Sequence, residues 1–572
     1  MKPLTHIPPV SAQPLGPVLD VSLDGQSSTI IIRTKSHMAT LTIFSDGIVR
    51  IQWHNGLDVF HQLVQPLLEP SLTVQTININ HHPDQWIVTS TDITVRIFPD
   101  GRVTVVHKSR TQFDLFGWMA VGTSLLGHIT AQAEEHVFGL GEKTGHLDKR
   151  GRLWTQWTTD VHPHTPATDA MYQAIPVMVM ASPEASRGLF LANTYRTYFE
   201  LRNSDTYIVG ADDGPLSLYL YMGPSIQSVL QQHINTTGRP FLPPRWALGF
   251  QQSRYSYATQ SRVEQIAQEY RQRQIPLDVI YLDIDYMDGY RLFTWDSKRF
   301  PDPTGLLHQL AEQGIHVVTI IDPGVKLEET YPVFKSGQEL NAFIRYANGE
   351  PFRSQVWPGM CVFPDFVKES VRKWWAQLNY QWAKQGVAGI WNDMNEPALF
   401  GYNPQLPIDG GYASDAGIIH QTDTDEVLPH IGIHNTYALL QANATVRGLS
   451  TDSNRRPFLL SRSGFAGIQR WAAVWTGDNS SWWEHLAQSI PMCLNLGLSG
   501  VPFVGPDIGG FFGAPSPELF VRWIQAGVFY PFARIHTDTG TPDQEPWSFG
   551  SQVEDIARRY IGFRYRLLPY LE

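Results

Sequence analysis

The chain is 572 residues long and 42% apolar, which suffices for two or three globular domains and is too long for one compact core. Its net charge of −11 and the lack of any Lys/Arg-rich run exclude a typical nucleic-acid-binding protein. The chain has two cysteines, no signal-peptide core at its start and no run of about 18 apolar residues, so we expect no disulfide framework, no membrane partner and a cytoplasmic location.

Residues 1–238 are predicted to form an N-terminal antiparallel β-sandwich. In DITVRIFPDGRVTVVHK (92–108), alternate residues are apolar on both sides of a Pro-Asp-Gly turn, which is the pattern of a hairpin with one buried face. The stretch FSDGIVRIQW (44–53) repeats this pattern around an Asp-Gly turn. Several such hairpins, each with one buried face, are typical of two sheets packed together.

After residue 238, helices and strands are predicted to alternate. Ser261 and Glu264 can form a capping box at the start of a helix with one apolar side. Two further helical stripes, around 306–311 and 367–382, are each followed by a strand that is apolar at successive positions. Strands of this kind are buried on both faces, as parallel sheets require.

The second domain, residues 239–572, is predicted to be a (β/α)8 TIM barrel, which makes the fold class α/β. Segments 324–363 and 398–455 are long and loop-rich, so we interpret them as insertions over the barrel mouth. A doubly wound sheet has similar periodicity, but it does not explain why polar residues close so many strands. The eight candidate strands are WALGFQQ (246–252), LDVIYLD (277–283), HVVTIID (316–322), VAGIWND (387–393), PFLLSRS (457–463), AAVWTGD (472–478), GVPFVGPD (500–507) and FYPFARI (529–535).

Five of these strands end in or near an aspartate, at the edge where TIM barrels have their active sites. A single such residue is more often a helix cap or a loop salt bridge, but five carboxylates at one edge, without a matching set of Lys or Arg, need a common reason. Carboxylates beside tryptophans suit a site that binds hydroxyls and stabilises a positive transition state, which is glycoside chemistry. The five are Asp283, Asp322, Asp393, Asp478 and Asp507.

Six ordered motifs resemble glycoside hydrolase family 31, in its α-glucosidase branch, over roughly residues 130 to 572. The resemblance implies a retaining, exo-acting α-glucosidase that removes terminal glucose from an oligosaccharide or disaccharide substrate. It implies that Asp393 is the nucleophile, that Asp478 is the general acid and base, and that Glu396 either supports the loop or receives a hydrogen bond behind the residues that touch the sugar. The motifs are PLDVIYLDIDYMD (276–288), VWPGMCVFPDF (356–366), GIWNDMNEP (389–397), SRSGFAGIQRWAAVWTGDN (461–479), VGPDIGGFFG (504–513) and FYPFARIH (529–536).

The resemblance also implies which residues bind the sugar. Tyr255 stands where many family members have Trp, so the linkage preference stays open. Asp160, in QWTTDVHPH, matches a loop of the N-terminal domain that reaches the leaving-group side of the site. The expected substrate-binding residues are Asp283, Arg462, His536, Trp357, Trp391, Trp475, Phe511, Tyr255, Met394, Asp507 and Asp160.

No metal or cofactor is predicted. His162 and His164 lack further ligands nearby in sequence, so a solvated loop is the better interpretation. The stretch GLGEKTG (139–145) lacks the spacing of a phosphate-binding loop, so we interpret it as a strand end and turn. The sequence ends at the predicted last barrel helix, so we expect a chain without the family's C-terminal β-domains. A transglucosylase, an α-xylosidase of the same family and a non-catalytic sugar-binding module remain alternatives, and the oligomeric state stays open.

Overall fold

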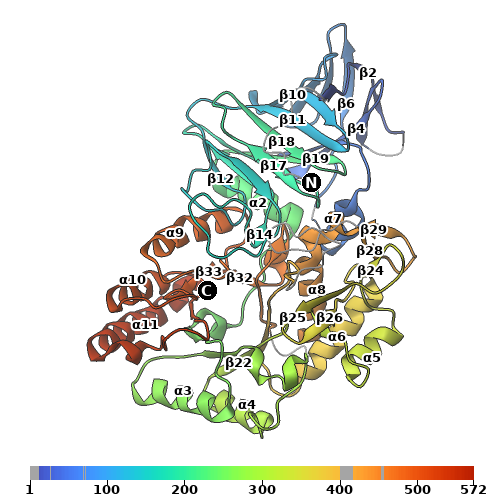
Figure 1. The fold of residues 1–572 in the computed structure, drawn as a ribbon. Helices are drawn as coiled ribbons and strands as arrows, with labels where there is room; N and C mark the ends of the chain where they lie inside the picture. The colour runs from blue at the N-terminus through green and yellow to red at the C-terminus, as the bar shows by residue number, and fades with distance from the viewer. Residues whose placement is uncertain (1–11, 26–27, 69, 71, 400–416, 452–455) are drawn as a thin grey trace.

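A computed structural model describes residues 12–572 except 26–27, 69, 71, 400–416 and 452–455. A domain made mostly of β-strands, blue to green in Figure 1, lies against a barrel of strands and helices, green to red. The predicted order of a β-sandwich followed by a TIM barrel is confirmed. In the described part of the chain, no helix is long and apolar enough to cross a membrane.

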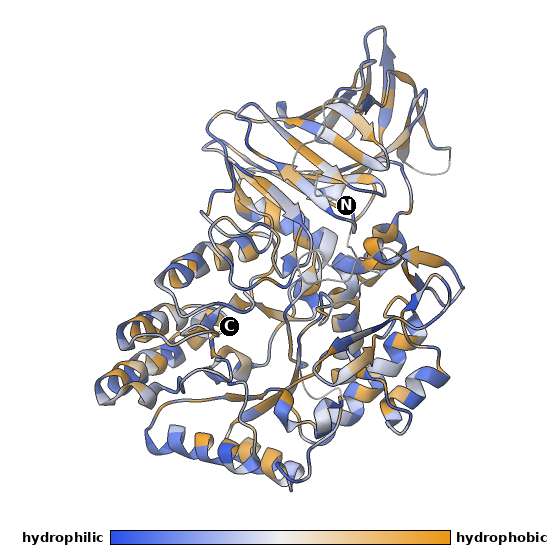
Figure 2. Cartoon of the chain, in the orientation of Figure 1, coloured by the Kyte–Doolittle hydropathy of each residue, from blue (hydrophilic) through white to orange (hydrophobic). Residues whose placement is uncertain are grey.

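The N-terminal domain consists of two antiparallel sheets. Buried aliphatic and aromatic side chains from both sheets form one core, and the alternation of orange and blue along these strands in Figure 2 reflects their one-sided burial. The larger sheet has the order β13 (Leu153–Gln156), β17 (Thr197–Glu200), β18 (Thr206–Ala211), β11 (Ser124–Thr130), β10 (Arg110–Val121), β9 (Val103–His107), β8 (Ile93–Ile97), β7 (Gln85–Thr89) and β6 (Asn78–His82), with β1 (Gln13–Pro14) beside β10. The other has the order β12 (His136–Gly139), β15 (Val177–Ala181), β16 (Ser186–Leu191), β19 (Leu216–Gly223), β5 (Ile48–Trp53), β4 (Met38–Phe44), β3 (Thr29–Thr34) and β2 (Val18–Leu23).

Both predicted hairpins are confirmed. β8 and β9 pair with Ile97 opposite Val103, and β4 pairs with β5 across a short turn at Ser45–Gly47. The GLGEKTG stretch is a strand end and turn, as predicted, because β12 ends at Gly139.

The barrel strands are parallel and follow one another around a ring. β33 lies within the predicted strand GVPFVGPD and β34 begins at its last residue, Asp507, so the two are separated by Pro506. They join opposite ends of the sheet order. The ring is therefore closed by one segment. In order, the strands are β33 (Val504–Gly505), β32 (Ala473–Trp475), β30 (Leu459–Ser461), β27 (Gly389–Asn392), β22 (His316–Ile320), β21 (Val279–Leu282), β20 (Gln251–Gln252), β35 (Arg534–Ile535) and β34 (Asp507–Ile508).

One detail of the helix prediction is wrong. Helix α3 begins two residues earlier than predicted, so its first N–H groups meet Thr259, whose side chain accepts a hydrogen bond from the N–H of Arg262. Ser261 and Glu264 therefore lie inside the helix and form no capping box. The barrel helices are α3 (Gln260–Gln272), α4 (Pro303–Glu312), α6 (Glu369–Ala383), α8 (Tyr437–Leu449), α9 (Trp483–Leu498), α10 (Pro517–Gly527) and α11 (Ser551–Leu571).

The two predicted insertions differ in how far they are loops. The first forms a small sheet with helix α5 (Pro332–Glu339), whereas the second holds α8, which packs along α6 and against β27 and β30. The prediction of a loop-rich insertion is wrong for α8, because its apolar residues are buried as in any barrel helix. The remaining insertion elements are β23 (Val325–Lys326), β24 (Arg345–Tyr346), β25 (Arg353–Val356), β26 (Gly359–Val362), β28 (Ile418–Gln421), β29 (Val427–Pro429) and α7 (His430–Ile433).

The two domains share a hydrophobic core. Helix α2 (Ile226–Thr237) and side chains such as Phe60 belong to the same buried cluster as the barrel interior, and the rings of Phe60 and Phe465 lie 6.4 Å apart. A second link is made by β14 (Gln173–Ala174), which pairs in parallel with β31 (Gly464–Phe465). The N-terminal domain is therefore fixed against the loop that follows β30.

Candidate active site

The Arg462 side chain, at the carboxyl end of β30, is the centre of the site. Its guanidinium is buried and forms a two-point ion pair with Glu396, with N–O distances of 3.0 and 2.8 Å. Its Nε lies 3.1 Å from Asp393 Oδ1, and its Nη atoms lie 3.4 Å from Asp160 and 3.8 Å from Asp478. One cation therefore brings together four carboxylates from three distant parts of the sequence.

The turn after β27 fixes the direction of the Asp393 side chain. Met394, which follows, has a φ of 53°, a left-handed conformation that is uncommon for a side chain of this kind. The next residue, Asn395, donates from its amide to Ser461 Oγ and accepts from the N–H of Ser463. These bonds tie the turn to the loop that carries Arg462, so Asp393 and Arg462 are positioned together.

A second cluster of polar and aromatic side chains surrounds His536. Asp283, directly after β21, has a carboxylate oxygen 3.7 Å from His536 Nε2, and the Nδ1 of this ring lies 2.7 Å from Ser253 Oγ. Phe511 stacks on the imidazole at 4.8 Å, and the ring of Trp391 meets it edge-on at 5.1 Å. The structure thus brings four residues of the predicted sugar pocket into one aromatic and polar cluster.

Below this cluster, the barrel interior holds a buried ion pair between Asp507 and Arg534. Arg534 Nη2 donates to Asp507 Oδ1 at 2.7 Å, and both side chains are fully buried. The guanidinium also lies 4.8 Å from the ring of Trp391 and 5.1 Å from that of Trp475. Asp507 therefore pairs with Arg534 inside the barrel, and the Arg534 guanidinium packs against the rings of Trp391 and Trp475.

Tyr255 and Trp357 lie together, with ring centroids 5.9 Å apart. The Trp357 side chain is 37% exposed, whereas Trp391 and Trp475 are buried. Burial raises the pKa of Tyr255, and the charge of Asp283 adds to the rise, so Tyr255 stands close to the Asp283 cluster. The predicted aromatic wall therefore has a buried inner part and an exposed outer part.

The environment separates the two predicted catalytic carboxyls. Burial raises the pKa of both Asp393 and Asp478, and Arg462 opposes the rise in each case. The pKa of Asp478 lies well above its usual range, because Arg462 is farther from it and the charge of Asp393 adds to the effect. Asp393 is therefore the more readily ionised of the two.

Asp322 was predicted at this edge only as one of the five strand-end carboxylates, without a role, and Arg534 and Tyr172 were not predicted at the site. Asp322, two residues after the end of β22, has one buried oxygen without a hydrogen-bond partner in the described residues. Burial raises its pKa well above the usual range, and the charge of Asp393 adds to the rise. Its position at a strand end was the signal. Arg534 could have been found as the cation inside the apolar run FYPFARI. Tyr172 carries no such signal.

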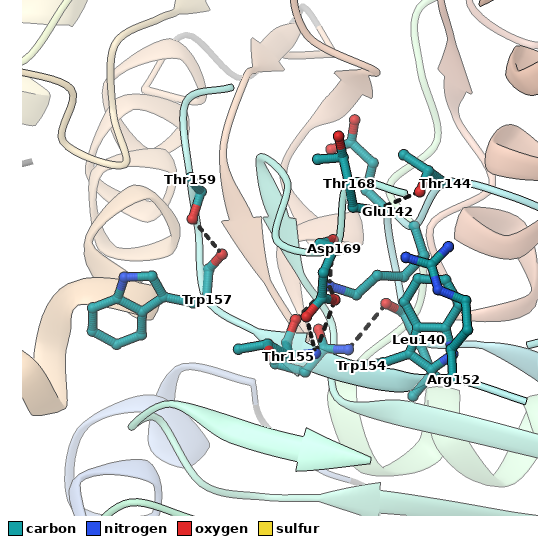
Figure 3. A network of polar contacts seen from close by, with 12 residues as sticks. Leu140, Glu142, Thr144, Arg152, Trp154, Thr155, Trp157, Thr159, Thr168 and Asp169 are labelled. Atoms are coloured by element: carbon teal, nitrogen blue, oxygen red, sulfur yellow. Dashed lines mark hydrogen bonds and ion pairs between the residues drawn. The ribbon is translucent and has the colours of Figure 1, made fainter. Parts of the chain in front are cut away.

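The N-terminal domain reaches the site through residues 157–174, here called the strap. Figure 3 shows the base of the strap, where both Asp169 oxygens accept from the N–H of Thr155. The buried Lys143 forms an ion pair with Asp169. Asp160 of the strap reaches Arg462, so the predicted approach of this loop to the barrel is observed.

The two strap histidines differ in exposure. His162 is exposed, and its ring lies 3.7 Å from that of Phe512. His164, predicted to lie in a solvated loop, is instead buried, because its ring stacks on His485 at 4.0 Å. Among the described residues, no group of three or more His, Cys, Asp or Glu side chains could hold a metal ion.

The matches to family descriptions decide the classification. Residues 240–572 match "Glycosyl hydrolases family 31 TIM-barrel domain", and residues 38–200 match "Glycosyl hydrolase 31 N-terminal galactose mutarotase-like domain". The chain belongs to glycosyl hydrolase family 31. This family assignment accounts for both domains and for their order, and it confirms the resemblance seen in the motifs.

Curated relatives and solved structures agree with it. Alpha-glucosidase 2 of Bacillus thermoamyloliquefaciens is 47% identical over 76% of this chain and 55% of its own length, and the alpha-glucosidase of Saccharolobus solfataricus is 35% identical over 79% and 67%. The family 31 alpha-glucosidase of Bacteroides thetaiotaomicron has a TM-score of 0.69 and 38% identity, covering 77% of this chain and 72% of its own. This chain thus spans about half to two thirds of the length of those two curated relatives.

Proposed function

We propose that this protein is a retaining, exo-acting α-glucosidase that removes terminal α-linked glucose from short α-glucosides. The observation that carries the proposal is the shared guanidinium of Arg462, which gathers Asp393 and Asp478 and leaves Asp393 the more readily ionised. Several relatives are named alpha-glucosidases, which supports glucose as the sugar.

In the first step, Asp393 attacks the anomeric carbon and forms a glycosyl ester, while the bond to the leaving oxygen breaks. Asp478 gives its proton to that oxygen, which its raised pKa permits. In the second step, Asp478 takes a proton from water, the water oxygen bonds to the anomeric carbon and the ester to Asp393 breaks. Two inversions return glucose with the α configuration.

The remaining carboxylates and rings have binding roles in this proposal. Asp283 and His536 would bind hydroxyls on the side of the ring away from the leaving group, and Asp160 would face the leaving sugar. Phe511 and the outer wall of Tyr255 and Trp357 would pack against apolar faces of the sugar. Glu396 neutralises part of the Arg462 charge and fixes its plane.

The alternatives differ in what accepts or holds the sugar. A transglucosylase would use the same ester and pass glucose to a second sugar, and an α-xylosidase would prefer a ring without the exocyclic hydroxymethyl group. A non-catalytic sugar-binding module would bind without turnover, although it would have no use for the unequal environments of Asp393 and Asp478. Location in the cytoplasm stays a prediction.

The deciding experiment is proton NMR of the first product from maltose and isomaltose, with nitrophenyl α-glucoside and α-xyloside run in parallel. We expect α-glucose before mutarotation and faster release from the glucoside. Early β-glucose would contradict the retaining mechanism, and faster release from the xyloside would contradict glucose specificity. Oligosaccharides formed at high maltose concentration would favour the transglucosylase.

A further inference from the structure

We propose that Tyr172, a residue of the N-terminal domain, is a positioning residue for the acid step: it holds the backbone of Asp478 and the guanidinium of Arg462 in place. The inference rests on the proposed function of Asp478 as the general acid. It adds a role for the strap that is separate from binding the sugar.

The contacts of Tyr172 converge on the two residues it would position. Its hydroxyl accepts a hydrogen bond from the N–H of Asp478 at 3.4 Å and donates to the carbonyl of Val161 at 3.0 Å. Its ring lies 5.2 Å from the Arg462 guanidinium, and its carbonyl accepts from Ser463 Oγ at 2.9 Å. Tyr172 itself is fully buried, so these contacts are shielded from water.

The strap holds both polar groups of the Asp478 peptide. While Tyr172 takes the N–H, His162 lies with Nδ1 3.2 Å from the Asp478 carbonyl oxygen. Among the described residues, no neutral group donates a hydrogen bond to the Asp478 side chain, and the contact of this side chain with Arg462 is long, at 3.8 Å. The direction of its carboxyl is therefore set by its backbone, which the other domain fixes.

The barrel sequence is adapted to this approach. Gly477 has a φ of 63°, and a Cβ added there would lie 1.9 Å from a ring carbon of Tyr172. Next to Tyr172, Gln173 donates from its side chain to the Arg462 carbonyl and pairs with Gly464 in the β14–β31 ladder. The glycine of the WTGD motif thus makes room for the tyrosine, and the neighbouring residues lock its position.

Two variants of Tyr172 test the contributions of its hydroxyl and of its ring separately. Tyr172→Phe keeps the ring beneath Arg462 and removes the hydrogen bonds of the hydroxyl to the Asp478 N–H and to the Val161 carbonyl. We expect kcat on maltose to fall about tenfold, the effect of one lost buried hydrogen bond, with little change in KM. On an aryl α-glucoside with an activated leaving group, which needs little proton donation, kcat should change less than about threefold.

Tyr172→Leu also removes the ring, so it should lower kcat on both substrates, because Arg462 positions Asp393 as well. Tyr437→Phe is the matched control: Tyr437 is equally buried and donates to the carbonyl of Pro364, so its variant should retain wild-type rates. Equal losses on both substrates in Tyr172→Phe, or no loss on either, would overturn the proposal.

Amide hydrogen exchange gives a second measurement that needs no turnover. The Asp478 amide should exchange about tenfold faster in Tyr172→Phe than in the wild type, since its acceptor is gone. An unchanged exchange rate would refute the hold on Asp478 even if the activity fell. If the wild-type protein hydrolyses neither substrate, the proposed function is wrong, and this exchange comparison still decides whether Tyr172 holds Asp478.

Discussion

At the scale of single residues, Arg462 determines how the surrounding carboxyls differ. It stands closest to Glu396 and Asp393 and farther from Asp478, so its charge favours ionisation unequally. A buried arginine with several carboxylates is stable only if all of them keep their geometry, because an unpaired buried charge is costly. The same arrangement that orders the site therefore makes its members depend on one another.

Asp393→Ala should lower kcat by about 10⁴-fold or more, because no other carboxyl lies where the attack would occur. The fold should survive, since Arg462 keeps its two-point pair with Glu396. Single-turnover kinetics and thermal unfolding of the same preparation measure both effects. Activity close to that of the wild type would show that Asp393 is not the nucleophile.

Asp478→Ala should lose most activity on maltose and keep more on an activated aryl α-glucoside, whose leaving group needs no proton. Azide should restore part of the rate, since this small anion can attack the ester without a base. The product should then be α-glucosyl azide, which NMR identifies. Equal losses on both substrates without azide would contradict the role of Asp478 as the acid.

Glu142 is a buried carboxyl outside the site, and it predicts how stability depends on pH. Burial raises its pKa to about 8 from 4.5, so between these values the folded chain keeps a proton that the unfolded chain has lost. Its contribution to stability therefore falls as pH rises from 4.5 to 8, by ~1.4 kcal/mol per unit. Glu142→Gln, which cannot ionise, should flatten the fall of the unfolding free energy with pH.

Denaturant unfolding between pH 5 and pH 9 measures this slope. Glu184→Gln is the control, because Glu184 lies on the same domain with its side chain 77% exposed. The slope of Glu184→Gln should match that of the wild type. If Glu142→Gln shows the same slope as both, the buried carboxyl does not carry the effect.

The sequence indicated the carboxylates and missed what organises them. Asp393 and Asp478 stand at the ends of apolar strands and within recognisable motifs, so both could be found without the structure. Arg462 was predicted as a sugar-binding residue, but its ion pairs with four carboxylates depend on loops that only the folded chain brings together. Tyr172 was missed because its partners lie about 300 positions away.

At the scale of elements, a substitution at the start of helix α3 tests whether Thr259 is its N-cap. Thr259→Ala should reduce the unfolding free energy by ~1 kcal/mol, because the N–H of Arg262 loses its acceptor. Ser261→Ala is the matched control and should change stability by less than about 0.5 kcal/mol, since Ser261 is exposed within the first turn. A larger loss from Ser261→Ala would favour the capping box that the sequence predicted.

Elements were predictable where periodicity was strong and local. The hairpins follow from apolar residues at every second position, and the buried side of α3 follows from apolar residues three or four positions apart. Both repeats are set by local sequence. The exact start of α3 is not, because Thr259, Ser261 and Glu264 all offer capping groups and tertiary contacts choose among them. Helix α8 was missed because its apolar residues cover more than one side, so they do not form a single helical stripe.

At the scale of the whole molecule, the shared core predicts that the barrel needs the N-terminal domain. Residues 240–572 expressed alone should be aggregated or unfolded, because apolar side chains now packed against Phe60 and α2 would face water. Near-ultraviolet circular dichroism and gel filtration test this. A soluble monomer with a cooperative unfolding transition would show that the domains are independent.

The barrel was predictable as eight buried strands, but its closure was not. The sequence offered GVPFVGPD as one strand, whereas the structure has two short strands, β33 and β34, on opposite sides of Pro506, and these join both ends of the sheet. Proline cannot donate to a ladder, so it marks the break. Which neighbours the two halves find depends on the arrangement of all the other strands.

The pairing of β14 with β31 also limits how such enzymes can be recombined. A chimera that exchanges the whole N-terminal domain for that of a relative would carry in a foreign strap against a native WTGD glycine and a native Arg462 loop. The crossover point between the two parent sequences therefore cannot lie at the domain boundary. Grafts that move residues 157–174 together with 462–481 keep both sides of the contact from one parent, and these are the recombinants that should retain turnover.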